Sequence, residues 1–275
     1  MKPGWLARLL PPSWRRLPPR IPDALWHATL ADYPFLAWRS PEDVQALRSM
    51  AESFLATKEF HGAEGFAVTD EVAVAVAAQA CLPVLKLGLS WYGGFVGIVM
   101  HEGPVLARRE WTDESGLVHT WQEELVGEAV EGGPVMLSWQ QGAAWRAGGL
   151  GEAADPKLDG TPDSEGAFNV VVHEFVHLLD LSDGVLDGIP ALPAEARQHW
   201  QGVLLESFDR FDERSACGYD SVVDAYGAQD PVEFFAVTSE AFFTRPRALR
   251  SEMPALYECY RSFYRQDPQA GSAEG

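Results

Sequence analysis

The segment 169–180, NVVVHEFVHLLD, restricts the possible folds of this chain more than any other feature. His173 and His177 are four residues apart, and Glu174 follows the first histidine. In an α-helix, residues four apart project from the same face, so both imidazoles could bind one metal ion. Glu174 would then lie beside a metal-bound water and could accept its proton. The spacing predicts a helix that carries a zinc site, although VVV before His173 locally favours a strand.

The alternative for this segment is a structural helix with two unrelated histidines. Two features favour the metal site: Asn169 is a suitable N-cap, and HEFVHLL places polar residues in a buried helix only where a metal would need them. Zinc lowers the pKa of a bound water to about 7, and a neighbouring carboxylate can take the proton as the water attacks a carbonyl carbon. The motif therefore indicates the hydrolytic chemistry of a metallopeptidase.

A catalytic zinc site of this type needs a third protein ligand and leaves its fourth position to water. The longer pattern H-E-x-x-H-x-x-G-x-x-H is absent, because Asp180 stands at its glycine position and Asp183 at its last histidine position. Without that glycine turn, Asp183 is a weak candidate. Asp180 could accept the second N–H of a ligand histidine, or lie in solvent near the helix end.

Two glutamates of a later predicted helix, residues 231–243, are stronger candidates for the third ligand. Glu233 and Glu240 are seven residues apart and share a face of a largely apolar helix, where an unpaired charge is costly. Each has another explanation, because Asp230 and Glu233 form a D-x-x-E capping box and Glu240 could pair with an arginine. The spacing does not choose between them.

The composition excludes several classes of protein. A formal net charge of −19 argues against a nucleic-acid partner, because phosphate contacts need clustered Lys and Arg. No apolar run reaches the roughly 18 residues of a membrane span. The three cysteines are far apart, which argues against a disulfide framework or a cysteine zinc site. The basic N-terminus lacks the apolar core of a signal peptide, so we expect a cytoplasmic protein.

Hydrophobic periodicity predicts helices and strands on both sides of the motif. Helices are expected at 41–58, 70–79, 194–211, 231–243 and 254–264, and strands within 82–103 and at 105–111, 116–122 and 133–139. Residues 141–168 are rich in Gly, Ala and Asp, which predicts a long loop that is either a lid over the site or disordered. We expect a basic, flexible segment at 1–24, one domain at 25–268 and a disordered tail at 269–275.

Several separated segments resemble the Mlc titration factor A family. They run in the family's order over most of the chain, and they are LPVLKLGLSW, GPVMLSW, NVVVHEFVHLLD and DAYGAQDPVEFFAVTSEAFF. The resemblance implies a zinc peptidase, described as aminopeptidase-like and related to the catalytic domain of anthrax lethal factor. It implies an α+β, zincin-like fold in which a mixed sheet packs on the motif helix and further helices surround it.

The resemblance also implies roles for individual residues. One zinc ion per chain would be held by His173, His177 and Glu233, the last being the glutamate of the D-P-x-E segment. Tyr226, seven residues earlier, would assist the oxyanion at the scissile carbonyl, whereas without the family a core tyrosine is as good an explanation. His119, in the family's G-L-V-H segment, could occupy the remaining metal position in a closed, latent form.

We therefore predict a cytoplasmic zinc peptidase that acts on a peptide substrate. Glu174 would be the general base and would later pass its proton to the leaving amine. Glu240 would support a ligand rather than be one, and the strand GPVMLSW would be the sheet edge that pairs with an extended peptide. The rival is a regulatory protein with a latent zinc site that sequesters a transcriptional repressor such as Mlc. The presence of Glu174 favours the enzyme, because a purely structural site does not need it.

Overall fold

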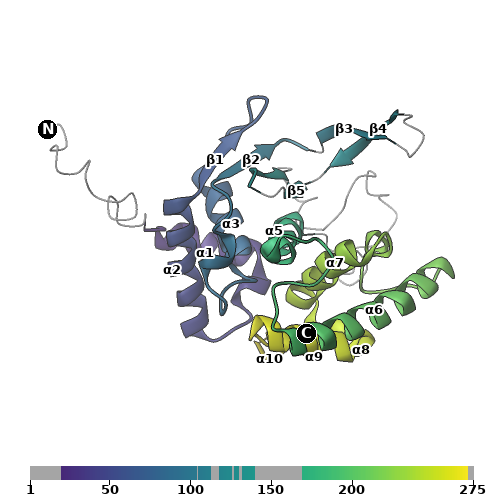
Figure 1. The fold of residues 1–275 in the computed structure, drawn as a ribbon. Helices are drawn as coiled ribbons and strands as arrows, with labels where there is room; N and C mark the ends of the chain where they lie inside the picture. Colours follow the sequence, from purple (N-terminus) through teal and green to yellow (C-terminus); the bar gives the residue numbers. More distant parts are fainter. Residues whose placement is uncertain are drawn as a thin grey trace, which may run out of the picture.

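The fold combines a small mixed sheet with a larger set of helices, as a computed structural model of the chain shows (Figure 1). The model describes residues 20–103, 105–112, 118–125, 127–129, 132–139 and 169–271, and only the backbone within 105–125 and 128–129. The predicted α+β class is confirmed. In the described part of the chain, no helix has both the length and the apolar character needed to cross a membrane.

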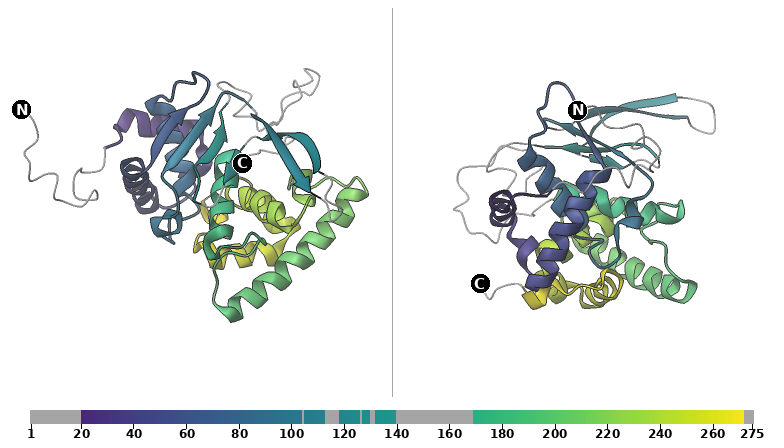
Figure 2. Two further views of the ribbon diagram at one scale, coloured as in Figure 1. Left: turned by 45° about the horizontal axis from the view of Figure 1, so that its top comes forward. Right: turned by 90° about the vertical axis from the view of Figure 1, so that its left-hand side faces the viewer.

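The main sheet has four strands in the order β1-β2-β6-β5. Their bounds are β1 Glu59–Gly62, β2 Gly97–His101, β5 Gly127–Ala129 and β6 Val135–Ser138. β1, β2 and β6 are parallel, and β5 runs antiparallel to β6 along the sheet edge. A separate antiparallel ribbon, β3 Val105–Thr112 and β4 Val118–Leu125, extends beyond the sheet (Figures 1 and 2).

The helices lie on one side of the sheet, with α5 at the centre (Figures 1 and 2). The α-helices are α1 Asp23–Asp32, α2 Pro41–Thr57, α3 Asp70–Cys81, α5 Val170–Asp180, α6 Ala194–Ala216, α7 Pro231–Thr244, α8 Pro246–Glu252, α9 Pro254–Tyr264 and α10 Pro268–Gly271. The short 3₁₀ turns are η3 Pro34–Ala37, η4 Leu89–Tyr92, η5 Leu181–Asp183 and η6 Ala225–Ala228. α5 contacts α3 and α7 as well as the strands β5 and β6, so it links these two helices to the sheet.

The motif segment is helical from its first valine. The side chain of Asn169 caps α5 by accepting the N–H of Val172, as the sequence predicted. All three valines of VVV are buried, so burial of the first turn outweighs their local preference for a strand. One turn further on, Phe175 packs its ring 5.7 Å from that of Phe54 and 5.0 Å from that of Tyr92. These contacts fix the helix that carries both histidines.

Helix α7 begins at a strong N-cap and runs through the core. The carboxylate of Asp230 accepts the N–H groups of Val232 and Glu233, and Pro231 occupies the first helical position. The apolar side chains of α7 are buried, Phe234 and Phe235 in its first two turns among them. Because α7 packs against α5, its acidic residues can reach the histidines of the motif.

Two predictions about the strands are wrong. Residues 82–87 form turns, in which the N–H of Leu85 bonds to the carbonyl of Leu82, and within 82–103 the only strand is β2. The strand GPVMLSW, observed as β6, is not an edge, because it lies between β2 and β5. The edge strand β5 has only three residues, GEA, and therefore gives no hydrophobic alternation to detect.

The described residues reach beyond both ends of the predicted domain 25–268, whose boundaries stay a prediction. Ile21 is buried and its N–H donates to the carboxylate of Glu52, and α1 begins at Asp23, so these residues of the predicted segment 1–24 pack on the fold. At the other end, α10 includes the start of the predicted disordered tail, where Gln269 accepts a hydrogen bond from Arg250. Residues 1–19, 272–275 and the predicted loop at 141–168 lie outside the described residues.

Candidate metal centre

Three predicted ligand atoms converge where α5 meets α7. Nε2 of His173 lies 3.0 Å from Nε2 of His177 and 3.0 Å from Oε2 of Glu233. Nε2 of His177 lies 3.5 Å from the same carboxylate oxygen. Tetrahedral zinc with ligands at about 2.1 Å would separate its ligand atoms by about 3.4 Å. The three atoms are therefore arranged as one small cation would require.

The charges at this centre also fit a cation. Oε2 of Glu233 is buried and has no hydrogen-bond partner among the described residues, although both histidines are close. Burial alone would raise the pKa of Glu233, but His173 and His177 hold it well below its usual range. A buried carboxylate oxygen that faces two imidazole nitrogens is a donor set typical of zinc. These residues fit the predicted metal.

Glu240 contacts the ring nitrogen of His173 that faces away from His177 and Glu233. Its Oε1 lies 2.7 Å from Nδ1 of His173, and its Oε2 accepts the N–H of Asn169 at 2.5 Å. Burial raises the pKa of Glu240. Burial also acts to lower the pKa of His173, but its contacts with Glu233 and Glu240 raise it to about 10. With Nδ1 donating to Glu240, Nε2 is left to face the predicted metal position, an arrangement that fits the predicted supporting role of Glu240.

The same contacts extend to a third helix. The side chain of Asn169 donates to Oε1 of Gln79 on α3 at 2.8 Å, and Gln79 is fully buried. The polar chain therefore runs from α3 through the N-cap of α5 to Glu240 on α7 and ends at His173. Because every link is buried, the orientation of the imidazole depends on the packing of three helices.

Glu174 lies between the metal face of α5 and the sheet. Only 5% of its surface is exposed, and burial raises its pKa. Its carboxylate lies directly against the backbone of Gly127, the first residue of β5. The sequence predicted that Glu174 neighbours the metal site, but it gave no indication of the strand above it.

Tyr226 is on the other side of the histidines, in η6. Its ring centroid lies 6.0 Å from that of His173, and its side chain is half-buried. The carboxylate of Asp224 accepts the N–H of Tyr226 at 2.8 Å and so shapes the turn. The structure therefore brings the predicted tyrosine beside one of the predicted metal ligands.

His119 is placed only through its backbone. It lies in β4, opposite Trp111 of β3. Its side chain is outside the described part of the structure, so closure of the metal site by His119 stays a prediction.

The two aspartates after the motif do not take the roles considered for them. Asp180 is fully buried and accepts backbone N–H groups of residues 187–189, so it holds the following loop and not a ligand histidine. Burial raises its pKa to about 6. Asp183 is turned away from the cluster and pairs with Arg197 at 2.7 Å. Helix α5 ends at Asp180, and η5 then directs the chain away from the metal position.

Comparison with known proteins agrees with this centre. The family model described as glucose-regulated metallo-peptidase M90 matches residues 13–265. The chain belongs to this family. Mlc titration factor A of Pectobacterium atrosepticum is 34% identical over 248 residues, which cover 89% of this chain and 87% of that protein. The same-named protein of Yersinia pestis (strain Pestoides F) is 34% identical over 250 residues, which cover 90% and 86% of the two chains. The predicted family resemblance is confirmed.

In this M90 metallo-peptidase, one cavity adjoins the motif helix. A cavity of about 520 Å³ lies at the C-terminal end of α5, beside Leu178 and Leu181. Its other wall includes Trp91, Tyr92 and Phe95 from the segment around η4. Leu178 is one helical turn after Glu174, so the cavity continues the face of α5 on which the carboxylate lies.

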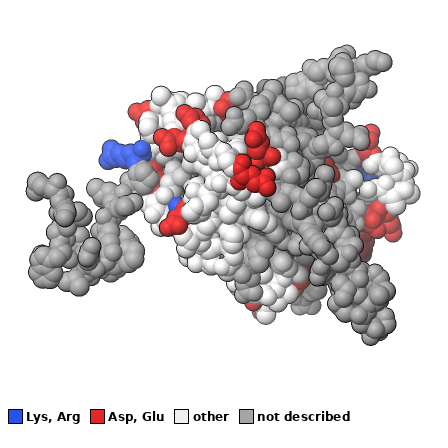
Figure 3. Space-filling view, turned by 90° about the horizontal axis from the view of Figure 1, so that it is seen from above, with Lys and Arg blue, Asp and Glu red and all other residues white. Residues whose placement is uncertain are grey.

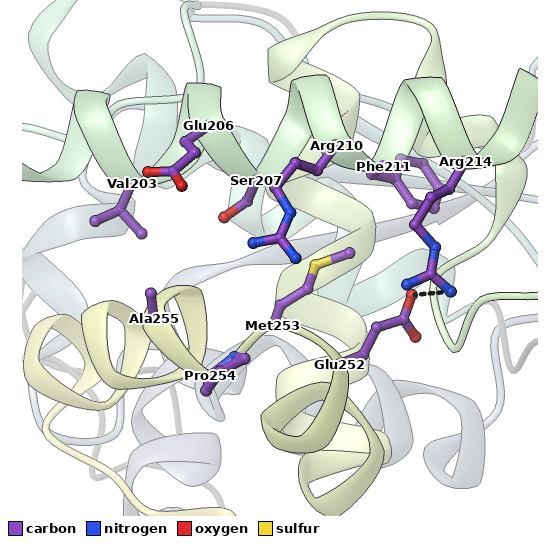
Figure 4. A pocket seen from close by; sticks show the side chains of 10 residues that line it. All are labelled: Val203, Glu206, Ser207, Arg210, Phe211, Arg214, Glu252, Met253, Pro254 and Ala255. Atoms are coloured by element: carbon purple, nitrogen blue, oxygen red, sulfur yellow. Dashed lines mark ion pairs between the residues drawn. The ribbon is translucent and has the colours of Figure 1, made fainter.

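A second, smaller pocket belongs to a different part of the fold. It has a volume of about 100 Å³ and lies between α6 and the corner of α8 and α9, where Arg210 and Arg214 point toward Met253 and Glu252 (Figure 4). Arg214 and Glu252 form a long ion pair of 4.0 Å. None of the three predicted metal ligands lines it, so we do not assign the catalytic chemistry to this pocket.

The described surface above the sheet carries more acidic than basic side chains. Asp and Glu are scattered over the described part of this face, and Lys and Arg are few (Figure 3). This agrees with the net charge of −19. The described part of this face has no basic cluster that could contact phosphates.

Proposed function

We propose that this chain is a zinc-dependent peptidase that hydrolyses peptide bonds. The observation that carries the proposal is the convergence of His173, His177 and Glu233 from two helices, with ligand atoms 3.0–3.5 Å apart. Zinc bound there would supply a polarised water and Lewis acidity for a carbonyl oxygen. Membership of the metallo-peptidase family supports the same chemistry.

Glu174 is the general base of this proposal. It follows the first ligand in sequence and is buried beside the metal face of α5. Burial raises its pKa, which brings the carboxylate closer to the range in which it can both take and return a proton. It accepts the proton of the attacking water and then donates it to the nitrogen of the leaving amine.

Tyr226 and the edge strand complete the proposed site. Tyr226 lies beside His173, where its hydroxyl would donate to the oxyanion that forms at the scissile carbonyl. β5 is a sheet edge that passes over Glu174, so its outer side offers backbone groups to an extended peptide. β5 therefore takes the role that the sequence had suggested for the strand GPVMLSW.

The finer assignments follow from the family resemblance. We propose an aminopeptidase-like preference, a cytoplasmic location and one zinc ion per chain. The test is hydrolysis of aminoacyl and peptide reporter substrates by zinc-loaded protein, with Glu174→Gln measured beside the parent. Activity in the parent and its loss in a variant that still binds zinc would support the proposal. Equal activity in both would contradict the role of Glu174.

A second candidate function comes from the name of the relatives. Two proteins 34% identical to this chain are called Mlc titration factor A, so we propose that this chain also binds a transcriptional repressor of the Mlc type. His119 would then close the metal site in a latent form. Binding of purified Mlc to zinc-loaded parent and to Glu174→Gln is the test. Equal binding by both proteins separates this role from catalysis, and no binding by either contradicts it.

A further inference from the structure

The backbone of the edge strand leaves no room between β5 and Glu174. A Cβ atom built on Gly127 would lie 2.5 Å from Cγ of Glu174 and closer still to its Cδ and Oε1. Real Cβ atoms essentially never come within 3.0 Å of such a neighbour. The carboxylate therefore occupies the space that any other residue at position 127 would need for its side chain.

The obstacle at Gly127 differs in kind from that at two other glycines. A Cβ atom at Gly62 would overlap the carbonyl group of Phe66, and at Gly188 it would lie 2.6 Å from the carbonyl oxygen of Pro231. At those positions the backbone itself would have to move. At Gly127 the three nearest atoms all belong to the side chain of Glu174, which can rotate. A methyl group there should displace the carboxylate before it displaces the strand.

The strand is the more firmly held of the two partners. Gly127 is paired with Leu137 of β6, and Ala129 with Val135. Both β6 residues are fully buried, and β6 itself pairs with β2 on its other side. β5 is thus fixed to the sheet by its backbone hydrogen bonds, whereas the Glu174 side chain can change its position by rotation about its χ angles.

The place of Glu174 matters because of the helix geometry. Successive residues of α5 are about 100° apart around the axis, so Glu174 leaves the helix beside the metal face and not on it. Its side chain extends between that face and β5, and only 5% of it is exposed. A change of about 1 Å in the position of a reacting group can cost about a hundredfold in rate.

We propose that Gly127 is a positioning residue for Glu174, since its lack of a side chain lets the carboxylate lie against β5 beside the metal centre. The functional part of this inference rests on the proposed role of Glu174 as general base. The geometric part concerns only the contact between the two residues.

The first test compares Gly127→Ala with the parent and with Gly97→Ala. Gly97 is a matched control, because it lies in β2 of the same sheet and a Cβ atom there meets only the ring of Pro134 at 3.4 Å. We expect Gly127→Ala to lower kcat about a hundredfold, with KM, zinc content and melting temperature close to the parent. We expect Gly97→Ala to behave as the parent. A kcat for Gly127→Ala within roughly twofold of the parent would overturn the proposal.

A double variant separates displacement of Glu174 from a general effect on the strand. Glu174→Asp shortens the side chain by one methylene and makes room for a methyl group at position 127. We therefore expect Gly127→Ala to cost much less in the Glu174→Asp background than in the parent. Equal, additive losses in the two backgrounds would contradict a direct contact.

The geometric part is decided without an activity measurement. In crystal structures of the metal-free parent and Gly127→Ala, we expect the Glu174 carboxylate to differ by about 1 Å or more while β5 keeps its pairing with β6. A shifted β5 with an unmoved Glu174 would overturn the inference. If the zinc-loaded parent cleaves no peptide, the proposed function fails, and these two structures still decide whether Gly127 positions Glu174.

Discussion

Oε1 of Glu240 lies 2.7 Å from Nδ1 of His173, and Oε2 of the same carboxylate accepts the backbone N–H of Asn169. One carboxylate thus fixes a proposed metal ligand and the first turn of the helix that carries it. Glu240 is 2% exposed, and its contacts to α5 offset only part of the cost of burying a charge, since its pKa is still raised by burial. The orientation of His173 and the packing of α5 against α7 therefore both depend on Glu240.

Replacement of Glu240 should weaken metal binding without removing a ligand. Glu240→Gln is expected to lower zinc affinity about 10- to 100-fold, because the neutral amide holds His173 less firmly in the required tautomer. Competition with a chelator of known affinity measures the change. Glu213→Gln, on the exposed side of α6, is the control and should bind zinc as the parent does. Unchanged affinity in Glu240→Gln would show that His173 is oriented by other contacts.

Loss of Glu233 should have a larger effect than loss of Glu240. Glu233→Ala removes one of three protein ligands and leaves two imidazoles, so we expect the purified variant to contain little zinc. Metal analysis by mass spectrometry gives the zinc content per chain, with Glu240→Ala prepared in parallel. Equal zinc in Glu233→Ala and parent would contradict its assignment as a ligand.

The sequence pointed to site residues where the spacing is local or where a charge lies in an apolar helix. The spacing of His173 and His177 defines a helix face, and a charge such as Glu240 within an apolar helix demands a partner. Glu233 could not be separated from its capping role by spacing, and the family resemblance was needed to choose it. The structure adds the distances that the sequence could not supply.

The missed features depend on contacts between distant segments. β5 has three residues and no apolar alternation, so only its pairing with β6 reveals it as the edge strand. The contact between Gly127 and Glu174 joins two segments whose sequence separation gives no signal. Asp180 was considered as a partner of a histidine because both lie on one helix, yet the backbone of the following loop offers it three donors. Local spacing does not show which of two possible partners is closer in the fold.

Removal of Tyr226's hydroxyl should affect catalysis and not metal binding. The ring centroid of Tyr226 lies 6.0 Å from that of His173, and Tyr226 is not one of the three proposed ligands. We expect Tyr226→Phe to keep its zinc and its KM and to lose about a hundredfold or more in kcat, as for loss of one oxyanion donor. Steady-state kinetics with a peptide reporter, together with metal analysis, tests this. A parent-like kcat would favour a structural role for the tyrosine.

Asp180 should contribute to stability through the loop that follows α5. Asp180→Ala leaves the buried N–H of Gly188 without its acceptor. The N–H of Ile189 keeps Asp187 as an acceptor at 3.1 Å, and the N–H of Asp187 loses a long hydrogen bond. At about 1–3 kcal/mol for an unsatisfied buried group, we expect a loss of about 2 kcal/mol in the free energy of unfolding. Urea denaturation of metal-free protein measures it. Asp183→Ala removes a more exposed ion pair and should cost less than about 1 kcal/mol.

Zinc binding should release a proton from His173. In the metal-free protein, the pKa of His173 is raised to about 10 by Glu233 and Glu240, so the imidazole is charged at pH 7.5. Because this pKa lies above the unfolded value, the contribution of His173 to stability is complete below pH 6.5 and is lost as the pH rises through 10.

Zinc needs the neutral imidazole, so binding must displace that proton. Calorimetric titration of chelator-treated protein with zinc, in two buffers with different ionisation enthalpies, gives the number of protons released. At pH 7.5 we expect about one proton to be released from His173, in addition to any proton released by ionisation of the zinc-bound water. Glu240→Gln removes one of the groups that raise the pKa of His173, and should release fewer protons than the parent. Equal proton release by parent and variant would show that Glu240 does not control the protonation of this ligand.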